Sequence, residues 1–288
     1  PEFLREGSAI KDFMIPDRIV IGSESKKAIK LVENIYQPLF LRDIPLVITN
    51  HETAELIKYA TNAFLATKIS FINEIANICE RVGADVNQVR KGIGSDQRIG
   101  YKFIYPGCGF GGSCFPKDIK ALINIAKNHG YEADLIAAVD RVNKAQKDVL
   151  FSKLTMKLGA DLKGKRIAVW GLSFKPETDD VREAPALNLI RSIVKAGGIV
   201  SAYDPKAVTE AQFYLKGVAV NYCEDKYTAL ESADAVVLVT EWKEFRSPDF
   251  DLILLKMKGN LFLDGRNQFE SDLIRSKGFE YIQIGVKD

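Results

Sequence analysis

From Lys165 onward the chain alternates short apolar runs with amphipathic stretches, and this pattern restricts the fold more than any other feature. Six apolar runs predict buried strands: KRIAVW, IVSAYD, VAVNY, AVVLVT, NLFLDG and EYIQIG. Helical patterns separate most of them. Strands that are apolar throughout and joined by helices belong to parallel sheets covered on both faces. We therefore expect an α/β fold whose residues 161–288 form a Rossmann-like, doubly wound parallel-sheet domain.

The first 48 residues show the same alternation on a smaller scale. RIVIG (18–22) and PLVITN (45–50) predict strands, with a helix over about 24–36 between them. Three elements cannot bury a core by themselves, so we expect residues 1–48 to be the remnant of a larger Rossmann-like domain. The chain begins PEFLREG, without Met, which indicates that a preceding part was removed or lies outside this sequence.

The middle of the chain, residues 49–160, is expected to be entirely helical. No Gly or Pro interrupts residues 51–82, which predicts one helix of roughly 48 Å that starts at the capping pair Thr49 and Glu52. Its apolar residues cover more than one face, which is typical of a helix packed against several partners. Further helices are expected from Pro116 to a break at Gly130, and over about 133–158. We expect this helical block to form the interface of a homodimer.

Composition excludes several classes of function. Lys and Arg number 40 and Asp and Glu 38, so the net charge of +2 predicts no binding to nucleic acid or to a membrane surface. No apolar run reaches the ~20 residues that a membrane-spanning helix needs. Two histidines in 288 residues nearly exclude a histidine-based triad. We expect no metal site and a cytoplasmic location, because neither metal-site nor secreted-framework spacing is present among Cys79, Cys108, Cys114 and Cys223.

Residues 107–112, GCGFGG, match G-x-G-x-x-G, the pattern of a dinucleotide-binding turn. The flanking sequence does not support that function, because YKFIYP is a poor strand and only helices are predicted afterwards. Cys114 offers another explanation for the glycines. Pro116 suits the first turn of a helix, which places Cys114 at an N-terminus where the helix dipole and nearby Lys117 stabilise a thiolate. Asp118 lies one turn further on and can face the same site.

Two interpretations of Cys114 stay open at this point. It is either a nucleophile beside glycines that let the backbone approach a ligand, or an inert cysteine beside a flexible loop. The long helix favours the nucleophile, because Lys58 and Asn62 lie four residues apart among apolar residues. An ammonium and a carboxamide on one helix face could stabilise an oxyanion. A solvated lysine is the ordinary alternative at such a position.

Six segments together resemble the nucleotide-sugar dehydrogenases, in particular the UDP-glucose branch of the UDP-glucose/GDP-mannose dehydrogenase family. They are PEFLREGSAIKDF (1–13), AELIKYATNAFLATKISFINEIANICE (54–80), SDQRIGYKF (95–103), GFGGSCFPKD (109–118), GLSFKPETDDVRE (171–183) and DGRNQF (264–269). The resemblance extends nearly from end to end but lacks the family's N-terminal glycine turn. It implies two-step, NAD-dependent oxidation of UDP-glucose to UDP-glucuronate, in a parent of which this chain is a truncated and inactive form.

The resemblance also implies roles for individual residues. Cys114 matches the nucleophile that forms a thiohemiacetal and then a thioester, and Lys58 and Asn62 match the pair that stabilises the oxyanion. Asp118 matches the carboxylate that assists proton movement, and Glu2 the acid–base glutamate. The implied sugar-nucleotide contacts are Phe3, Leu4, Arg5, Glu6, Arg98, Tyr105, Gly107, Gly109, Phe110, Gly111, Phe174, Lys175 and Arg266. The implied NAD contacts are Glu6, Cys114, Lys117 and Arg182. Arg98 is implied to reach the sugar of the neighbouring subunit.

Three alternatives stay open. Relatives that oxidise GDP-mannose or UDP-N-acetyl-hexosamines share the cysteine loop, although SDQRIG and NAFLATKISFINEIAN fit the UDP-glucose branch better. The chain as it stands could be a non-catalytic module for UDP-sugar binding and dimerisation. A cysteine hydrolase is disfavoured, because no histidine lies near Cys114 to act as its base.

Overall fold

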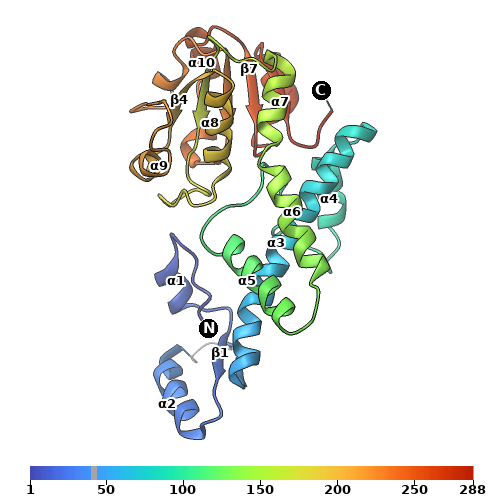
Figure 1. The fold of residues 1–288 in the computed structure, drawn as a ribbon, viewed down its shortest axis with the longest axis vertical. Coiled ribbons are helices and arrows are strands. Elements are labelled where there is room, and N and C mark those ends of the chain that lie inside the picture. Colours follow the sequence, from blue (N-terminus) through green and yellow to red (C-terminus); the bar gives the residue numbers. More distant parts are fainter. Residues whose placement is uncertain (40–43, 288) are drawn as a thin grey trace. The chain divides into compact units, whose positions relative to one another are not determined.

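The computed structural model describes residues 1–39 and 44–287, which divide into two compact units, residues 1–64 and 65–288. Figure 1 labels the main elements. No helix in the described residues is long and apolar enough to cross a membrane.

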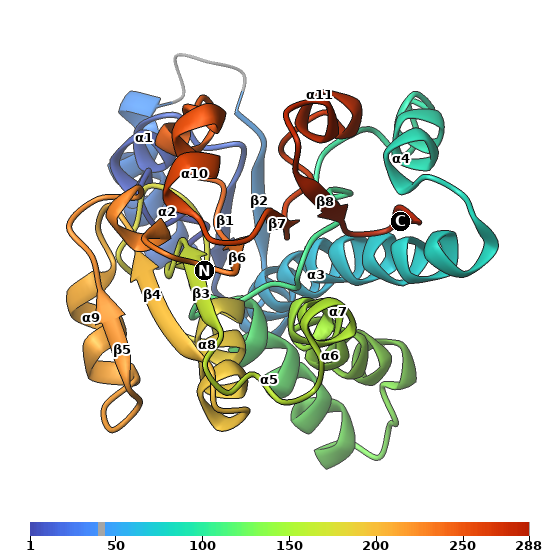
Figure 2. The same ribbon diagram turned by 90° about the horizontal axis from the view of Figure 1, so that it is seen from above.

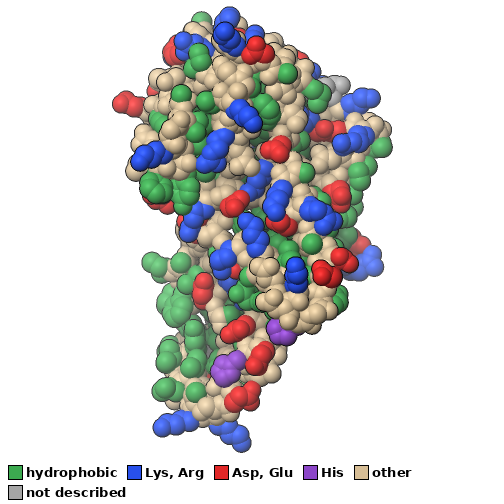
Figure 3. Space-filling model, in the orientation of Figure 1, with side chains coloured by type: hydrophobic (Ala, Val, Ile, Leu, Met, Phe, Trp, Pro, Cys, Tyr) green, Lys and Arg blue, Asp and Glu red, His purple; other side chains and the backbone are tan. Residues whose placement is uncertain are grey.

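The first unit holds a two-stranded parallel sheet, in which Ile19–Gly22 (β1) pairs with Leu46–Thr49 (β2). Its other elements are Ala9–Met14 (α1), Lys26–Tyr36 (α2), the 3₁₀ turn Gln37–Leu39 (η1) and the start of the long helix His51–Val82 (α3). The two strands and the helix predicted here are confirmed. Neither α1 nor α2 buries a residue. Hydrophobic side chains therefore gather on the surface of this unit (Figure 3): Ile10, Phe13, Met14, Leu31 and Ile35.

The start of α3 corrects the predicted cap by one residue. Thr49 is the last residue of β2, where it pairs with Gly22, so the strand fixes its conformation. Asn50 is the capping residue instead: its Oδ1 accepts a hydrogen bond from the N–H of Thr53 at 3.0 Å. The prediction of one helix over residues 51–82 is confirmed, and the predicted capping pair of Thr49 and Glu52 is wrong.

The second unit opens with a helical part. Its helices after α3 are Val86–Gly94 (α4), Phe115–Asn128 (α5), Asp134–Gln146 (α6) and Val149–Leu158 (α7). The sequence analysis did not identify α4, whose N-cap is Asp85. The prediction of one continuous helix over 133–158 is wrong, because α6 and α7 are separate helices. The N–H of Asp148 bonds to the carbonyl of Ala145, and this i→i−3 bond closes α6 before α7 begins.

A six-stranded parallel sheet forms the rest of this unit, in the order β5-β4-β3-β6-β7-β8. The strands are Arg166–Trp170 (β3), Ile199–Tyr203 (β4), Val220–Tyr222 (β5), Ala235–Leu238 (β6), Leu261–Asp264 (β7) and Glu280–Gln283 (β8). Between them lie Pro185–Lys195 (α8), Val208–Tyr214 (α9), Thr228–Leu230 (η2), Lys243–Phe245 (η3), Phe250–Lys256 (α10) and Ser271–Ser276 (α11). All six predicted strands are confirmed. The strand order reverses between β3 and β6, and ligands of doubly wound sheets bind at the carboxyl ends of strands beside such a reversal.

Alternate residues of β3 enter different core layers. Ile167 and Val169 belong to a cluster with residues of α7 and α8, whereas Ala168 and Trp170 belong to one with residues of α10 and α11. Figure 2 shows α7 and α8 on one side of the sheet and α10 and α11 on the other. All four side chains are fully buried. A strand covered on both faces must be apolar throughout, which is why its sequence signal was strong.

Candidate functional site

Cys114 is the N-cap residue of α5, and its side chain is exposed. Pro116 occupies the first turn, where its missing N–H removes no helical hydrogen bond. The N–H of Asp118 donates to the carbonyl of Cys114 at 2.9 Å, and Asp118 is only 2% exposed. Nζ of Lys117 lies 2.7 Å from Oδ1 of Asp118. The first turn of α5 thus holds an exposed thiol next to a lysine and a buried carboxylate.

The glycine-rich loop 107–112 lies between α4 and α5 and does not follow directly on a strand, and α6 then follows α5. The prediction that this is not a dinucleotide-binding turn is therefore confirmed. The glycines have another reason. A Cβ on Gly111 would lie 2.5 Å from the carbonyl oxygen of Glu183, and one on Gly112 would lie 2.8 Å from the ring of Phe174. The loop needs glycine because it packs closely against the segment that precedes α8.

This packing brings several predicted site residues together in the second unit. Phe174 lies against Gly112, whose N–H donates to the carbonyl of Arg182 at 2.7 Å. At the other end of the loop, a Cβ on Gly107 would lie 3.1 Å from Nη1 of Arg266. The loop, a segment after β3 and a residue after β7 therefore share one location at the carboxyl edge of the sheet.

Arg266 is held firmly at this edge. Its Nε donates to the carbonyl of Val239 at 2.7 Å and lies 3.2 Å from Oε2 of Glu241. Its side chain is 17% exposed. A guanidinium fixed by two partners presents its remaining N–H groups in a defined direction, which suits recognition of a phosphate.

An ion pair that the sequence analysis missed supports the same loop. Lys147, at the C-terminal end of α6, is 5% exposed and its Nζ lies 2.8 Å from Oε2 of Glu183. Lys120 of α5 lies 3.6 Å from the same carboxylate. The hydrogen bond from Lys147 holds the pKa of Glu183 below its usual value, against the opposing effect of burial. These contacts fix Glu183 beside Gly111.

The other predicted residues of this unit are more exposed. The guanidinium carbon of Arg90 lies 3.6 Å from the ring centroid of Tyr105, a cation–π contact that no sequence pattern indicated. Nζ of Lys175 lies 5.2 Å from the centroid of the Phe174 ring. Arg98 is not brought to the loop within the described residues: its side chain is 89% exposed and pairs with Asp96 at 2.6 Å.

In the first unit, the structure places Glu2 and Phe3 against Lys58. Nζ of Lys58 donates to the carbonyl of Glu2 at 2.6 Å and lies 5.5 Å from the centroid of the Phe3 ring. The guanidinium carbon of Arg18 lies 3.8 Å from the same centroid. The N–H of Leu4 donates to Oε2 of Glu2 at 2.8 Å. Four of the predicted residues are therefore neighbours of one another within this unit.

Two further predicted residues follow in the same segment. Arg5 forms a two-point contact with Asp12 at 2.5 and 3.0 Å, and its guanidinium holds the pKa of Asp12 well below its usual range. Glu6 is exposed at the start of a turn. Asn62 lies one turn after Lys58 on α3 and is 8% exposed. Lys58 and Asn62 belong to the first unit, whereas Cys114 belongs to the second.

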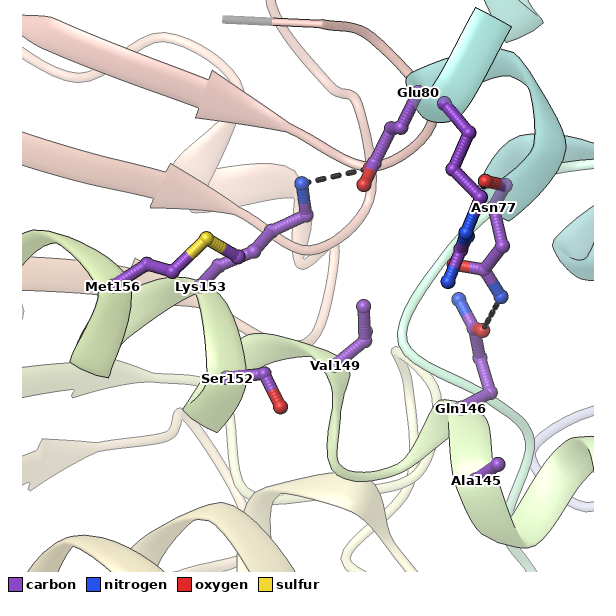
Figure 4. Close-up of a pocket in the computed structure, with 9 residues that line it drawn as sticks. Asn77, Glu80, Ala145, Gln146, Val149, Ser152, Lys153 and Met156 are labelled. Atoms are coloured by element: carbon purple, nitrogen blue, oxygen red, sulfur yellow. Dashed lines mark hydrogen bonds and ion pairs between the residues drawn. The ribbon is translucent and has the colours of Figure 1, made fainter. Parts of the chain in front are cut away.

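A cavity of about 530 Å³ lies between α3, α6 and α7 and contains none of the predicted site residues (Figure 4). Nζ of Lys153 pairs there with Oε1 of Glu80 at 2.7 Å, and Nδ2 of Asn77 donates to Oε1 of Gln146 at 2.8 Å. Within residues 1–39 and 44–287, no cluster of three or more His, Cys, Asp or Glu side chains is placed to hold a metal ion.

Three family models match the chain, all from the UDP-glucose/GDP-mannose dehydrogenase family. The model of its NAD binding domain matches residues 1–40, that of its central domain residues 52–145, and that of its UDP binding domain residues 168–271.

Individual proteins match over almost the whole chain. The UDP-glucose 6-dehydrogenase of Rhizobium meliloti is 47% identical over 290 residues, covering 100% of this chain and 66% of that protein. UDP-glucose 6-dehydrogenase TuaD of Bacillus subtilis is 50% identical over 285 residues, covering 99% and 61%. The structure of a UDP-glucose dehydrogenase from Pyrobaculum islandicum has a TM-score of 0.88 at 37% identity, covering 99% of this chain and 62% of that one. The chain thus spans somewhat less than two thirds of the length of these relatives.

Proposed function

The chain belongs to the UDP-glucose/GDP-mannose dehydrogenase family, and from this premise we propose that it carries the nucleophile and the sugar-nucleotide site of an NAD-dependent UDP-glucose 6-dehydrogenase. The observation that supports this most is the exposed thiol of Cys114 at the N-terminus of α5, directly after a glycine loop packed against Phe174 and Arg266. Thiols at helix N-termini are activated as nucleophiles by the helix dipole.

Cys114 traps the aldehyde formed at C6 of the sugar. Its thiolate adds to the carbonyl carbon, the C=O π bond becomes an oxyanion, and the oxyanion takes a proton to give a thiohemiacetal. At the thioester stage, water adds to the carbonyl carbon, the C–S bond breaks, and the carboxylate leaves with the thiolate restored. Asp118, buried one turn from Cys114, takes the proton of that water. The family resemblance assigns to Lys58 and Asn62 the ammonium and amide donors that stabilise this oxyanion.

The oxidant of this reaction is NAD, whose nicotinamide ring accepts a hydride when bound. Glu6, Lys117 and Arg182 are the residues of this chain that would contact it beside Cys114. In the described part of the first unit, the turn between β1 and α2 is Ser23-Glu24-Ser25, and only Asn50 separates β2 from α3. Neither is a glycine-rich turn that could hold a dinucleotide diphosphate at a helix N-terminus. Among the described residues, we therefore assign to the cofactor the contacts of Glu6, Cys114, Lys117 and Arg182 and no diphosphate-binding turn.

Titration of the 288-residue chain tests this proposal. We expect UDP and UDP-glucose to bind measurably, NAD to bind at least about tenfold more weakly than UDP, and the chain alone to show no dehydrogenase activity. Isothermal calorimetry with UDP, UDP-glucose, GDP and NAD is the measurement. If NAD binds as tightly as UDP-glucose, the proposal is contradicted. If GDP binds more strongly than UDP, the substrate is instead a GDP-sugar of the GDP-mannose branch.

The functional form is a homodimer built on α3. On the second-unit part of this helix, Phe71 and Ile78 lie seven residues apart and are 50% and 48% exposed, and Val82 is 69% exposed. Exposed apolar residues at heptad spacing are typical of a helix that packs against a second helix. A dimer also lets Arg98, exposed in the single chain, reach the site of the neighbouring subunit.

Charged substitution on this face is expected to separate the subunits. Wild-type chain should sediment as a dimer at micromolar concentration, and Phe71→Lys combined with Ile78→Lys should sediment as a monomer, because two ammonium groups cannot be buried in an apolar interface. Met156→Lys, a matched change at a 77% exposed apolar residue of α7, should leave the dimer intact. A monomeric wild-type chain in analytical ultracentrifugation would exclude the dimer.

An exposed catalytic thiol requires a reducing compartment, so we place the protein in the cytoplasm. Alkylation of freshly lysed cells without reductant should label Cys114. Recovery of Cys114 only in an oxidised, unreactive form would argue for another compartment.

A further inference from the structure

Gly107 is held at both of its peptide groups by buried side-chain amides. Its N–H donates to Oδ1 of Asn73 at 2.8 Å, and its carbonyl accepts from Nε2 of Gln146 at 2.6 Å. Asn73 is fully buried and Gln146 is 1% exposed. The two amides come from α3 and α6, so this loop residue is tied to two different helices.

Phe110 is held in the same way by a single side chain. Its N–H donates to Oδ1 of Asn143 at 2.8 Å, and its carbonyl accepts from Nδ2 of Asn143 at 3.0 Å. A carboxamide that bonds to both the N–H and the C=O of one residue imitates the edge of a neighbouring strand. Asn143 is 5% exposed and lies on α6 one turn before Gln146, so one helix reaches both ends of the loop segment 107–110.

The remaining N–H groups of the loop divide into two kinds. Those of Cys108 and Gly112 donate to the carbonyls of Gly265 at 3.2 Å and Arg182 at 2.7 Å. Within the described residues, the N–H groups of Gly109 and Gly111 have no such acceptor. Gly109 also has φ +95°, a left-handed conformation that any other residue adopts only with strain. The amide contacts thus hold the loop in one shape, in which these two buried N–H groups are not used by a backbone acceptor.

We propose that Asn73, Asn143 and Gln146 are positioning residues, which hold the loop so that the N–H groups of Gly109 and Gly111 bind the sugar nucleotide. This inference rests on the function proposed above. A loop fixed before binding loses little conformational freedom when the ligand arrives, so its donors contribute more to affinity. The three side chains together supply two acceptors and two donors to the loop at buried positions: Asn73 accepts from Gly107, Gln146 donates to Gly107, and Asn143 does both for Phe110.

A hydrogen bond from Asn77 sets the orientation of the Gln146 carboxamide. Its Oε1 accepts from Nδ2 of Asn77 at 2.8 Å in the wall of the 530 Å³ cavity, where Figure 4 shows the two side chains facing each other. With Oε1 occupied in this way, Nε2 is the atom directed at Gly107. Replacing Nε2 by oxygen therefore removes the donor to Gly107 without changing the size of the side chain.

Gln146→Glu and Gln283→Glu form a matched pair for the test. Both glutamines are buried, at 1% and 6% exposure, and both donate from Nε2 to a backbone carbonyl, Gly107 in one case and Phe269 in the other. Both changes place a carboxyl group in the core, where its charged form is disfavoured. UDP affinity of the 288-residue chain is measured by calorimetry, and the melting temperature by circular dichroism. We expect the dissociation constant for UDP to rise at least about tenfold in Gln146→Glu and to stay within about twofold in Gln283→Glu, at comparable melting temperatures.

Protonation of the new carboxyl group in Gln146→Glu should restore UDP affinity, which a general structural defect would not do. The carboxyl introduced by Gln146→Glu has its pKa raised by burial, and when protonated it again donates a hydrogen bond to Gly107. The charged groups that line the same cavity are Glu80, Arg81 and Lys153, and they are present in both proteins. The ratio of variant to wild-type dissociation constants should therefore fall as the pH is lowered from about 8 to about 5.5.

Amide exchange provides a readout without ligand. In Asn143→Asp, which loses the donor to the Phe110 carbonyl, peptides covering residues 104–114 should exchange faster than in wild type, while those covering β3 and β6 should not change. If UDP affinity in Gln146→Glu equals that of wild type, or falls equally in Gln283→Glu, the positioning role is overturned. Failure of wild type to bind UDP would instead overturn the proposed function and, with it, the ligand assigned to this loop.

Discussion

Replacement of Cys114 by serine is expected to abolish formation of UDP-glucuronate, with a fall in turnover on the order of 10³-fold or more, in a full-length dehydrogenase that contains this chain. A cysteine thiol is intrinsically the stronger nucleophile, whereas a serine hydroxyl needs an adjacent base to ionise it. His129 offers no such base, because it is the C-cap of α5, at the opposite end of a 14-residue helix from Cys114.

The measurement is steady-state UDP-glucuronate formation, followed by chromatography with UDP-glucose and NAD at saturation. Cys223→Ser is the matched control, because Cys223 is the other cysteine with solvent access and lies after β5, remote in sequence from the glycine loop. It should retain activity within about twofold, as surface substitutions generally do. Acid formation by Cys114→Ser at a rate close to that of wild type would remove the nucleophilic role.

Replacement of Asp204 by alanine is expected to destabilise the second unit by about 3–5 kcal/mol, the cost of breaking a buried charged hydrogen-bond network. Asp204 follows β4 and is 3% exposed. Its Oδ2 accepts from the N–H groups of Leu172 and Ser173 at 2.7 and 3.0 Å and from Nε1 of Trp242 at 3.0 Å. Its Oδ1 accepts from the N–H groups of Lys206 and Ala207 at 2.9 and 2.8 Å.

Alanine leaves these donors buried without an acceptor, and they belong to the turns after β3, β4 and β6. The turn after β3 leads directly to Phe174 and Lys175, so the same variant should also weaken UDP binding. Urea unfolding followed by tryptophan fluorescence isolates the effect, because both tryptophans, Trp170 and Trp242, lie in the second unit. Asp249→Ala is the control, because Asp249 is an ordinary N-cap of α10 whose Oδ1 accepts from the N–H of Leu252 at 3.0 Å. Its loss should lower the free energy of unfolding by about 1 kcal/mol. If Asp204→Ala lowers the free energy of unfolding by less than Asp249→Ala does, the Asp204 carboxylate is not needed for the stability of the second unit.

Local sequence patterns predicted an element correctly where all of its residues share the same surroundings. RIAVW and AVVL could be predicted as strands because both faces of β3 and β6 are buried, so nearly every residue must be apolar. The bounds of α3 followed from 32 residues without Gly or Pro. The cap was misplaced by one residue because pairing of Thr49 with Gly22 is a tertiary contact, and it leaves the capping role to Asn50.

The candidate site also has features that local sequence predicts and features that only tertiary contacts determine. The sequence by itself placed Cys114 at a helix N-terminus with Asp118 one turn away, because Pro116 and the glycines before it are local signals, and the structure added that the thiol is exposed. Only the tertiary structure decided what holds the loop. Gly107 lies 34 residues from Asn73 and 39 from Gln146, and Phe110 lies 33 from Asn143. A buried amide has no periodicity of its own, and whether it is satisfied depends on which backbone group the folded chain brings within hydrogen-bonding distance.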